Sequence, residues 1–131
     1  MSILIDTSAF IAYLSKEEKS HATVYEKMKE VLDGKFGAVF VSDYIFDETV
    51  TFAFRRFKNH EKITAFGQKI LDKLEMIFVD SETFEKSWKL FKKHKKLSFT
   101  DCTNIALMEN HGITHIMTYD AGFNGLVSVV N

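Results

Sequence analysis

Residues 3–14 read ILIDTSAFIAYL, and this stretch decides the fold. Its first three residues are all apolar, which predicts a short strand buried on both faces. Asp6 ends the strand, and residues 7–14 have the composition of a helix. A strand that passes directly into a helix begins the alternation that is typical of parallel sheets covered on both sides.

The rest of the chain repeats this alternation. Further strands are predicted at residues 38–41, 76–79, 115–118 and 126–130, and further helices at 20–32, 43–57, 61–74, from 81 or 82 onward, and from 98 or 100 to 111. Because crossovers between parallel strands are right-handed, helices should cover both faces of the sheet. The sequence therefore predicts an α/β fold, a three-layer α/β/α sandwich with a parallel sheet of about five strands.

Length and composition restrict the class of protein. A chain of 131 residues fits a single domain, 1–131, and 46% hydrophobic residues supply a core. The formal charge of −1 excludes a strongly basic nucleic-acid-binding coat. No apolar run approaches the roughly 18–20 residues needed to cross a membrane, and no signal peptide is recognisable. The single cysteine, Cys102, allows no internal disulfide, so we expect a cytoplasmic protein whose aromatic residues mostly fill the core.

Four acidic residues stand where a parallel sheet binds ligands. Asp6 and Asp120 each follow a predicted strand, Asp101 opens a helix, and Glu48 lies in an aromatic-rich helix. Ligands bind beyond the carboxyl ends of parallel strands, so these side chains are expected to converge. Clustered carboxylates repel one another unless a cation neutralises them or their pKa values rise. Oxygen ligands select a hard ion, which predicts Mg²⁺ or Mn²⁺.

Each acid also has a local alternative. Asp6 is placed to cap the helix that follows it, and Asp101 forms the Ser-x-x-Asp pattern of a capping box with Ser98. Asp120 precedes Ala-Gly, which is typical of a turn. Glu48 has Arg55 and Arg56 two turns further along its helix as candidate ion-pair partners.

Four segments in order resemble the PIN-domain ribonucleases, in particular the VapC-like toxins of toxin–antitoxin pairs. The segments are ILIDTSAF from residue 3, VSDYIFDETV from residue 41, LSFTDCTNIA from residue 97 and IMTYDAGF from residue 116. The resemblance implies a metal-dependent endoribonuclease in which Asp6, Glu48, Asp101 and Asp120 hold Mg²⁺ or Mn²⁺. It also implies a homodimer and a small antitoxin protein as partners.

Other residues near these motifs are candidates for supporting roles. Ser8 and Thr118 match the small hydroxyl positions beside the acids, and Asn104 follows Asp101 by one helical turn. Asn104 could reach the acids from this position; the alternative, which the sequence supports equally, is a surface residue of its helix.

RNA contacts are expected from basic residues in two places. Lys92 and Lys93 belong to a predicted helix whose lysines lie on the face opposite Phe84, Trp88 and Phe91. Arg55 and Arg56 lie on the same predicted helix as Glu48. Such residues contact phosphates without reading bases; a merely solvated lysine face is the alternative.

Two other functions are compatible with the sequence. One is a PIN-like module that binds RNA or protein without cutting it. The other is a metal-dependent phosphatase acting on small substrates. The absence of a second aspartate two residues after Asp6 disfavours an aspartyl-phosphate mechanism.

Overall fold

A parallel sheet of five strands forms the centre of the molecule in the computed structural model, which describes residues 1–131. The strands are β1 (Ser2–Ile5), β2 (Ala38–Ser42), β3 (Glu75–Ile77), β4 (His115–Met117) and β5 (Ser128–Val130). Their spatial order is β3-β2-β1-β4-β5. Along the chain, β2 and β3 are added on one side of β1, and β4 and β5 are then added on its other side. The direction in which strands are added therefore reverses between β1 and β4. Open α/β sheets bind their ligands at such a switch point.

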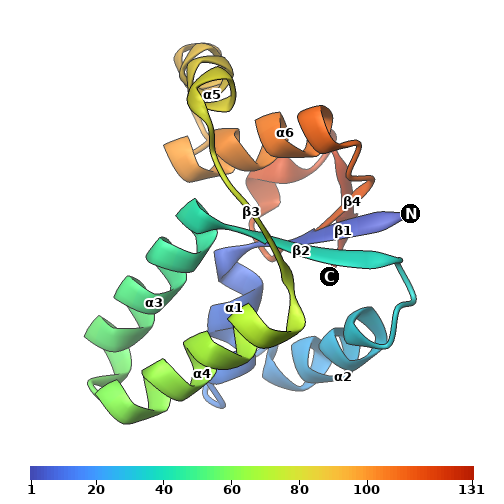
Figure 1. The fold of residues 1–131 in the computed structure, drawn as a ribbon. Coiled ribbons are helices and arrows are strands. Elements are labelled where there is room, and N and C mark those ends of the chain that lie inside the picture. The colour runs from blue at the N-terminus through green and yellow to red at the C-terminus, as the bar shows by residue number, and fades with distance from the viewer.

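Six α-helices cover the two faces of the sheet. They are α1 (Thr7–Leu14), α2 (His21–Leu32), α3 (Asp43–Phe57), α4 (His60–Lys73), α5 (Ser81–Lys93) and α6 (Phe99–His111). Figure 1 shows α5 and α6 on one side of β1 and β2, and α1, α2 and α4 on the other. α3 leaves the carboxyl end of β2 and projects beyond the sheet with α4 beside it. The predicted three-layer sandwich with a parallel five-stranded sheet is confirmed.

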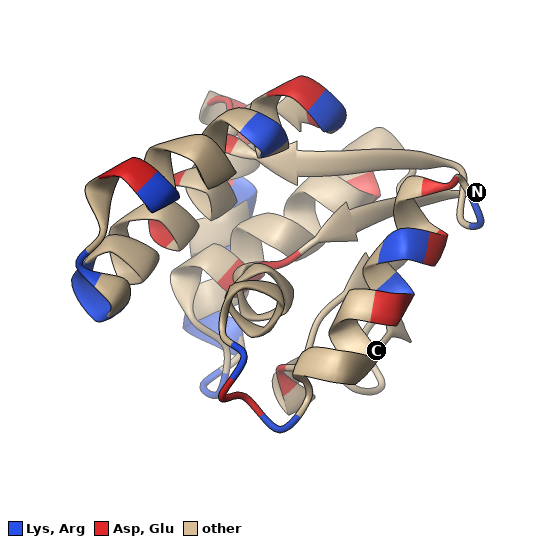
Figure 2. Cartoon of the chain, turned by 90° about the horizontal axis from the view of Figure 1, so that it is seen from below, with Lys and Arg blue, Asp and Glu red and all other residues tan.

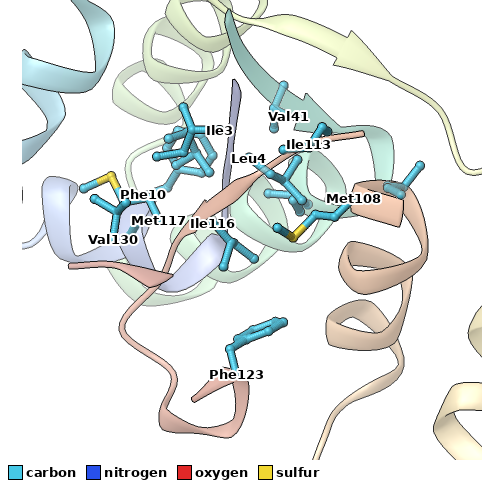
Figure 3. Packing of buried hydrophobic residues seen from close by; sticks show 14 of the residues in the cluster. Ile3, Leu4, Phe10, Val41, Met108, Ile113, Ile116, Met117, Phe123 and Val130 are labelled. Carbon is cyan, nitrogen blue, oxygen red and sulfur yellow. The ribbon is translucent and has the colours of Figure 1, made fainter. Parts of the chain in front are cut away.

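The core is built on both faces of β1, whose residues 3–5 are completely buried. Successive side chains of a strand point to opposite faces. Ile3 therefore packs toward Phe10 of α1, whereas Leu4 packs toward Met108 of α6, as Figure 3 shows. Burying a side chain of this kind contributes about 1.5–3 kcal/mol. This two-sided burial holds the end of β1, and with it Asp6, in a fixed place.

Local capping sets where the helices near this edge begin. The Ser42 hydroxyl accepts a hydrogen bond from the Ile45 N–H (3.0 Å) at the start of α3. Ser98 and Asp101 form the reciprocal bonds of a capping box at the start of α6. These caps satisfy N–H groups that the first helical turn leaves free, and they fix the helix starts that carry Glu48 and Asp101.

The two outer strands are shorter than predicted. β3 ends at Ile77 instead of residue 79, and β5 begins at Ser128 instead of residue 126. After β3 the Val79 N–H donates to Asp43 Oδ1 (3.0 Å), which takes the chain out of the sheet and leaves Phe78 exposed. Edge strands have only one neighbour, so apolar sequence alone does not extend them.

The aromatic residues of α5 do not form a buried face, contrary to expectation. Phe84, Trp88 and Phe91 remain 46%, 50% and 38% exposed. α5 instead buries the small residues Thr83 and Ser87, because a close approach to α6 favours small side chains. The aromatic stripe is thereby displaced to the edge, where all three rings lie around Phe99.

Charged residues are dispersed over the outer helices. Figure 2 shows Lys and Arg interspersed with Asp and Glu along these helices, in keeping with 17 basic and 18 acidic residues. None of the helices has both the length and the apolar character that a membrane span requires.

Candidate metal and nuclease site

All four predicted acids line one pocket, which we call the acidic pocket. It has a volume of about 530 Å³ and is open to solvent. Asp6 follows β1, Glu48 comes from the second turn of α3, Asp101 from the first turn of α6, and Asp120 follows β4. The other lining residues are Thr7, Ser8, Ile11, Ala12, Glu18, Ser20, Phe52, Arg56, Ser98 and Tyr119. The predicted convergence is therefore present, at the switch point between β1 and β4.

Asp6 is the buried centre of this group, with 3% of its surface exposed. Its Oδ2 accepts hydrogen bonds from the hydroxyls of Thr118 (2.8 Å) and Ser8 (3.2 Å). Burial raises the pKa of Asp6, the Glu48 carboxylate raises it further, and these two hydrogen bonds oppose the rise. Asp6 is the N-cap residue of α1 by position, as predicted, but its side chain makes no cap hydrogen bond to the helix, so capping does not account for the carboxylate.

The two hydroxyls are themselves fixed by the chain that follows β4. Ser8 Oγ accepts from the Tyr119 N–H (2.9 Å), and Thr118 Oγ1 accepts from the Asp120 N–H (3.1 Å). Ser8 and Thr118 therefore couple the ends of β1 and β4 through the Asp6 carboxylate. Both hydroxyls orient the acid, as residues around metal ligands commonly do.

Asn104 is completely buried, so its interpretation as a surface residue is wrong. Its Nδ2 donates to Asp6 Oδ1 (3.1 Å) across 98 residues of sequence. Its Oδ1 is buried without a hydrogen-bond partner. With Ser8 and Thr118, Asn104 makes three side-chain donors that hold Asp6 in one orientation.

Asp101 both caps its own helix and lines the acidic pocket. Its Oδ2 accepts from the Ser98 N–H (3.0 Å), which confirms the capping box. It also lines the acidic pocket. Burial raises its pKa to about 6, and the Asp6 and Asp120 carboxylates raise it in the same direction. Capping uses one carboxylate oxygen, so it does not exclude a ligand role for the other.

Asp120 and Glu48 complete the pocket at its exposed rim. Asp120 Oδ1 accepts from the Gly122 N–H (2.9 Å), so the predicted turn is present and leaves Oδ2 free. Glu48 makes no ion pair or hydrogen bond. The alternative in which Arg55 or Arg56 neutralises Glu48 is therefore wrong.

The donor chemistry of the acidic pocket fits a hard divalent cation. The acids present oxygen ligands only, and Cys102 beside Asp101 is buried in the core. As the side chains stand, no three Asp, Glu, His or Cys residues are close enough together to hold an ion. Of the other acids in the pocket, Glu48 is half-buried and Asp120 is exposed. Asp6 and Asp101 are the two buried acids of the pocket.

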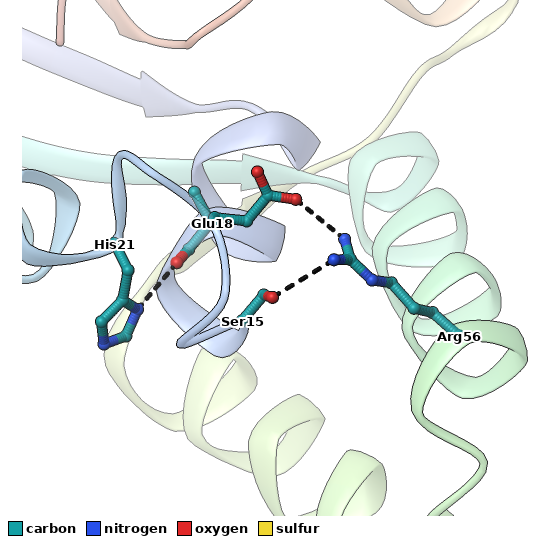
Figure 4. Close-up of polar contacts among 5 residues, drawn as sticks. Ser15, Glu18, His21 and Arg56 are labelled. Carbon is teal, nitrogen blue, oxygen red and sulfur yellow. Dashed lines mark hydrogen bonds and ion pairs between the residues drawn. The ribbon is translucent and has the colours of Figure 1, made fainter.

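Arg56 closes one side of the acidic pocket. Its guanidinium donates to Glu18 Oε1 (2.9 Å) and to Ser15 Oγ (3.3 Å), both in the segment between α1 and α2. Figure 4 shows this arrangement, in which Arg56 reaches from α3 across to that segment. His21 completes it by bonding the Ala12 carbonyl (2.9 Å). The chain's one cation in the pocket is thus paired with Glu18 and does not neutralise the four predicted acids.

The other predicted RNA-contacting residues lie apart from Asp6. Arg55 lines a neighbouring pocket that shares Glu48. Lys92 and Lys93 are exposed at the end of α5 and do not line the acidic pocket. Lys93 lines a different hollow with Lys95 and Lys96.

A sequence model of the PIN domain matches residues 3–127. The chain belongs to the PIN domain family. A VapC ribonuclease of Archaeoglobus fulgidus is 27% identical over 128 residues, which are 95% of this chain and 80% of that protein. Among solved structures, VapC20 of Mycobacterium tuberculosis, a toxin that cleaves the sarcin-ricin loop, superposes with a TM-score of 0.77 at 24% identity and 92% coverage of both chains.

A DNA-bound VapBC complex of Salmonella typhimurium superposes on this PIN domain with a TM-score of 0.72 at 14% identity, over 99% of this chain and 97% of that one. At such identity the likeness concerns the fold. The predicted membership of the PIN family is confirmed, and the roles of the individual acids stay a prediction.

Sequence reasoning missed several lining residues of the pocket. Glu18 lies in a polar segment that gives no sign of its partner Arg56, which is 38 residues away. The aromatic residues are expected mostly in the core, yet Phe52 is 48% exposed and lines the pocket. For Phe52 a signal was available, because it follows Glu48 by four residues and therefore shares its helical face.

Proposed function

We propose that this chain is a single-domain endoribonuclease that depends on Mg²⁺ or Mn²⁺ and acts as the toxin of a toxin–antitoxin system. Asp6, Glu48, Asp101 and Asp120 are the proposed metal ligands and catalytic residues. The observation that carries the proposal is the convergence of these four acids, from four separate elements, on one open pocket. The ribonuclease activity named for the A. fulgidus relative supports the substrate class.

The chain's own residues prepare this pocket for a cation and a phosphate. Ser8, Thr118 and Asn104 hold the Asp6 carboxylate in one orientation. Asp101 and Asp120 each keep one oxygen free of local bonds. A bound divalent cation would supply an activated water and stabilise the leaving oxygen of a phosphodiester. The raised pKa of Asp101, about 6, means that this acid is ionised and ready to bind a cation above that pH.

The proposed partners are RNA, a small antitoxin protein and a second copy of the chain. Solved VapBC complexes, such as that of S. typhimurium, share this fold and support the antitoxin. The exposed rings of Phe84, Trp88 and Phe91 support the homodimer, because an apolar patch of this kind marks an association surface. A cytoplasmic location is in keeping with one buried free cysteine.

Cleavage of RNA by the purified chain tests the proposal. The wild type should cut single-stranded and structured RNA with added Mg²⁺ or Mn²⁺, and EDTA should stop it. Asp6→Asn and Asp101→Asn should abolish the cleavage while circular dichroism shows an unchanged fold. RNA binding without cleavage would instead support the binding module, and release of phosphate from a monoester alone would support the phosphatase.

A further inference from the structure

Phe52 forms a ridge between two pockets. It follows Glu48 by one turn of α3, and these two residues line both the acidic pocket and a second pocket of about 360 Å³. The second pocket is completed by Tyr44, Asp47, Thr51, Arg55 and Thr100. The Phe52 side chain is 48% exposed and packs against no other aromatic ring of the chain, whereas the Phe84 and Trp88 rings both pack against Phe99. A large apolar face is therefore open to solvent beside Glu48.

One arginine stands on each side of this ridge. Arg55 lines the second pocket and Arg56 the acidic pocket. Consecutive helical residues point about 100° apart, and both arginines are within one turn of Phe52. Arg55 forms no ion pair, whereas Arg56 is bonded to Glu18 and Ser15. Arg55 is thus the cation with all its donors available for a ligand.

An apolar ring beside an unpaired arginine matches the chemistry of single-stranded RNA. The strand alternates flat bases with negative phosphates, and proteins bind it by stacking bases on aromatic rings and pairing phosphates with Arg and Lys. A duplex does not offer the face of a base, because each face is stacked on its neighbour. Acidic residues in the neighbouring pocket disfavour phosphates unless a cation lies close by, and the unpaired Arg55 lies one turn of the helix from Phe52.

We propose that Phe52 is a base-stacking residue that receives an unpaired nucleotide of the RNA next to the bond to be cut, with Arg55 contacting a flanking phosphate. The proposal rests on the proposed ribonuclease function and adds the residue that positions the RNA beside the acids. Stacking accepts any base, so Phe52 selects for an unpaired base and not for its identity.

Binding without cleavage tests this stacking directly. Short RNA strands that carry 2-aminopurine at successive positions are mixed with the full chain in EDTA. Stacking on the ring should quench the fluorescence at one position with the wild type and with Phe52→Trp, and the quenching should be lost with Phe52→Leu. The matched control is Phe54→Leu, since Phe54 is 46% exposed on the same helix and lines neither pocket.

Cleavage of the same strands gives a second readout. Phe52→Leu should lower kcat/KM roughly 5- to 150-fold, the equivalent of one stacked base, mainly through KM. Phe52→Trp should restore it, and Phe54→Leu should cut as the wild type does. Thermal unfolding establishes that the exposed substitutions leave the fold intact.

The outcomes separate this proposal from the proposed function. Wild-type quenching and wild-type kcat/KM in Phe52→Leu would overturn the stacking role and leave the nuclease in place; a Phe52 that serves a protein partner gives this result. Absence of cleavage by every form, the wild type included, would overturn the proposed function. The quenching in EDTA would then still decide whether Phe52 receives an unpaired base.

Discussion

At the scale of single residues, Asp6 is the side chain that the fold constrains most. It is buried, its carboxylate carries a raised pKa, and three uncharged side chains donate to it. A carboxylate buried without a cationic partner is costly, and no basic side chain of the chain contacts it. The hydrogen bonds offset part of that cost, and the proposed cation would offset more of it. The supporting donors are therefore as testable as the acid itself.

Thr118→Val should weaken Mn²⁺ binding by roughly 10–100-fold, the usual effect of removing a group that orients a ligand. Valine keeps the shape of threonine but loses the bonds to Asp6 Oδ2 (2.8 Å) and to the Asp120 N–H (3.1 Å). Isothermal titration calorimetry measures the change. Thr103→Val is the control, because Thr103 is equally buried and bonds only the Thr100 carbonyl. Equal Mn²⁺ affinities of the two variants would contradict the role of Thr118.

Asp101 predicts how the metal-free protein responds to pH. Burial raises its pKa to about 6, from 3.8 for the free group. The folded state thus binds the Asp101 proton more tightly than the unfolded state does. Protonation of Asp101 therefore stabilises the fold; this contribution is complete below about pH 4 and is lost as the pH rises through about 6. The wild type and Asp101→Asn should be similarly stable at pH 4, and the wild type should be the less stable at pH 7. Urea unfolding in EDTA measures both.

The prediction for Asp101 would be contradicted if the wild type became more stable than Asp101→Asn as the pH rises. That outcome would mean that the carboxylate is better stabilised in the fold than in water. Asparagine retains an oxygen that accepts the Ser98 N–H, so the cap at the start of α6 is preserved in the comparison.

At the scale of elements, the positions of strand and helix ends determine the pocket. The sequence predicts their order well, since apolar runs such as residues 3–5 have no solvent-exposed alternative. Asn104 was harder to place because residues 101–108 of α6 are buried on all sides, and helical periodicity then gives no inner face. The Arg56–Glu18 pair lay beyond prediction, since it depends on how α3 leaves the sheet toward the segment between α1 and α2.

The start of β2 depends on a close backbone approach. Gly37 has a φ of +78°, and a Cβ there would lie 2.0 Å from the Met1 carbonyl oxygen. Gly37→Ala should therefore lower the free energy of unfolding by at least about 2 kcal/mol, through strain and displacement of β1. Gly34→Ala is the control, since Gly34 has a φ of +94° with open space around it. Chemical unfolding measures both, and equal losses would contradict the contact.

At the scale of the whole molecule, the sheet brings chain segments that are far apart in sequence to one edge and leaves an aromatic patch at another. Packing of α5 on α6 through Thr83 and Ser87 exposes Phe84, Trp88 and Phe91. From the sequence these residues are predicted to form one apolar face of a helix. Their spacing identifies that face but does not show what covers it. A second copy of the chain is the proposed cover.

Trp88→Lys should convert the proposed dimer to a monomer. Placing a charge in the centre of an apolar interface removes buried area and adds a desolvation cost. Light scattering after size-exclusion chromatography reports the mass. Phe54→Lys, a change at an equally exposed aromatic residue on α3, should leave the dimer intact. A wild-type monomer, or a dimeric Trp88→Lys variant, would contradict this assignment.

The most direct measurement is anomalous X-ray scattering at the manganese edge from crystals of the wild-type chain grown with MnCl₂. The predicted result is a peak inside the pocket bounded by Asp6, Glu48, Asp101 and Asp120, with the carboxylates of Glu48 and Asp120 turned toward it. Crystals of Asp6→Asn should lack the peak. A pocket without manganese in wild-type crystals, at a concentration that supports RNA cleavage in solution, would contradict the assignment of these four acids as metal ligands.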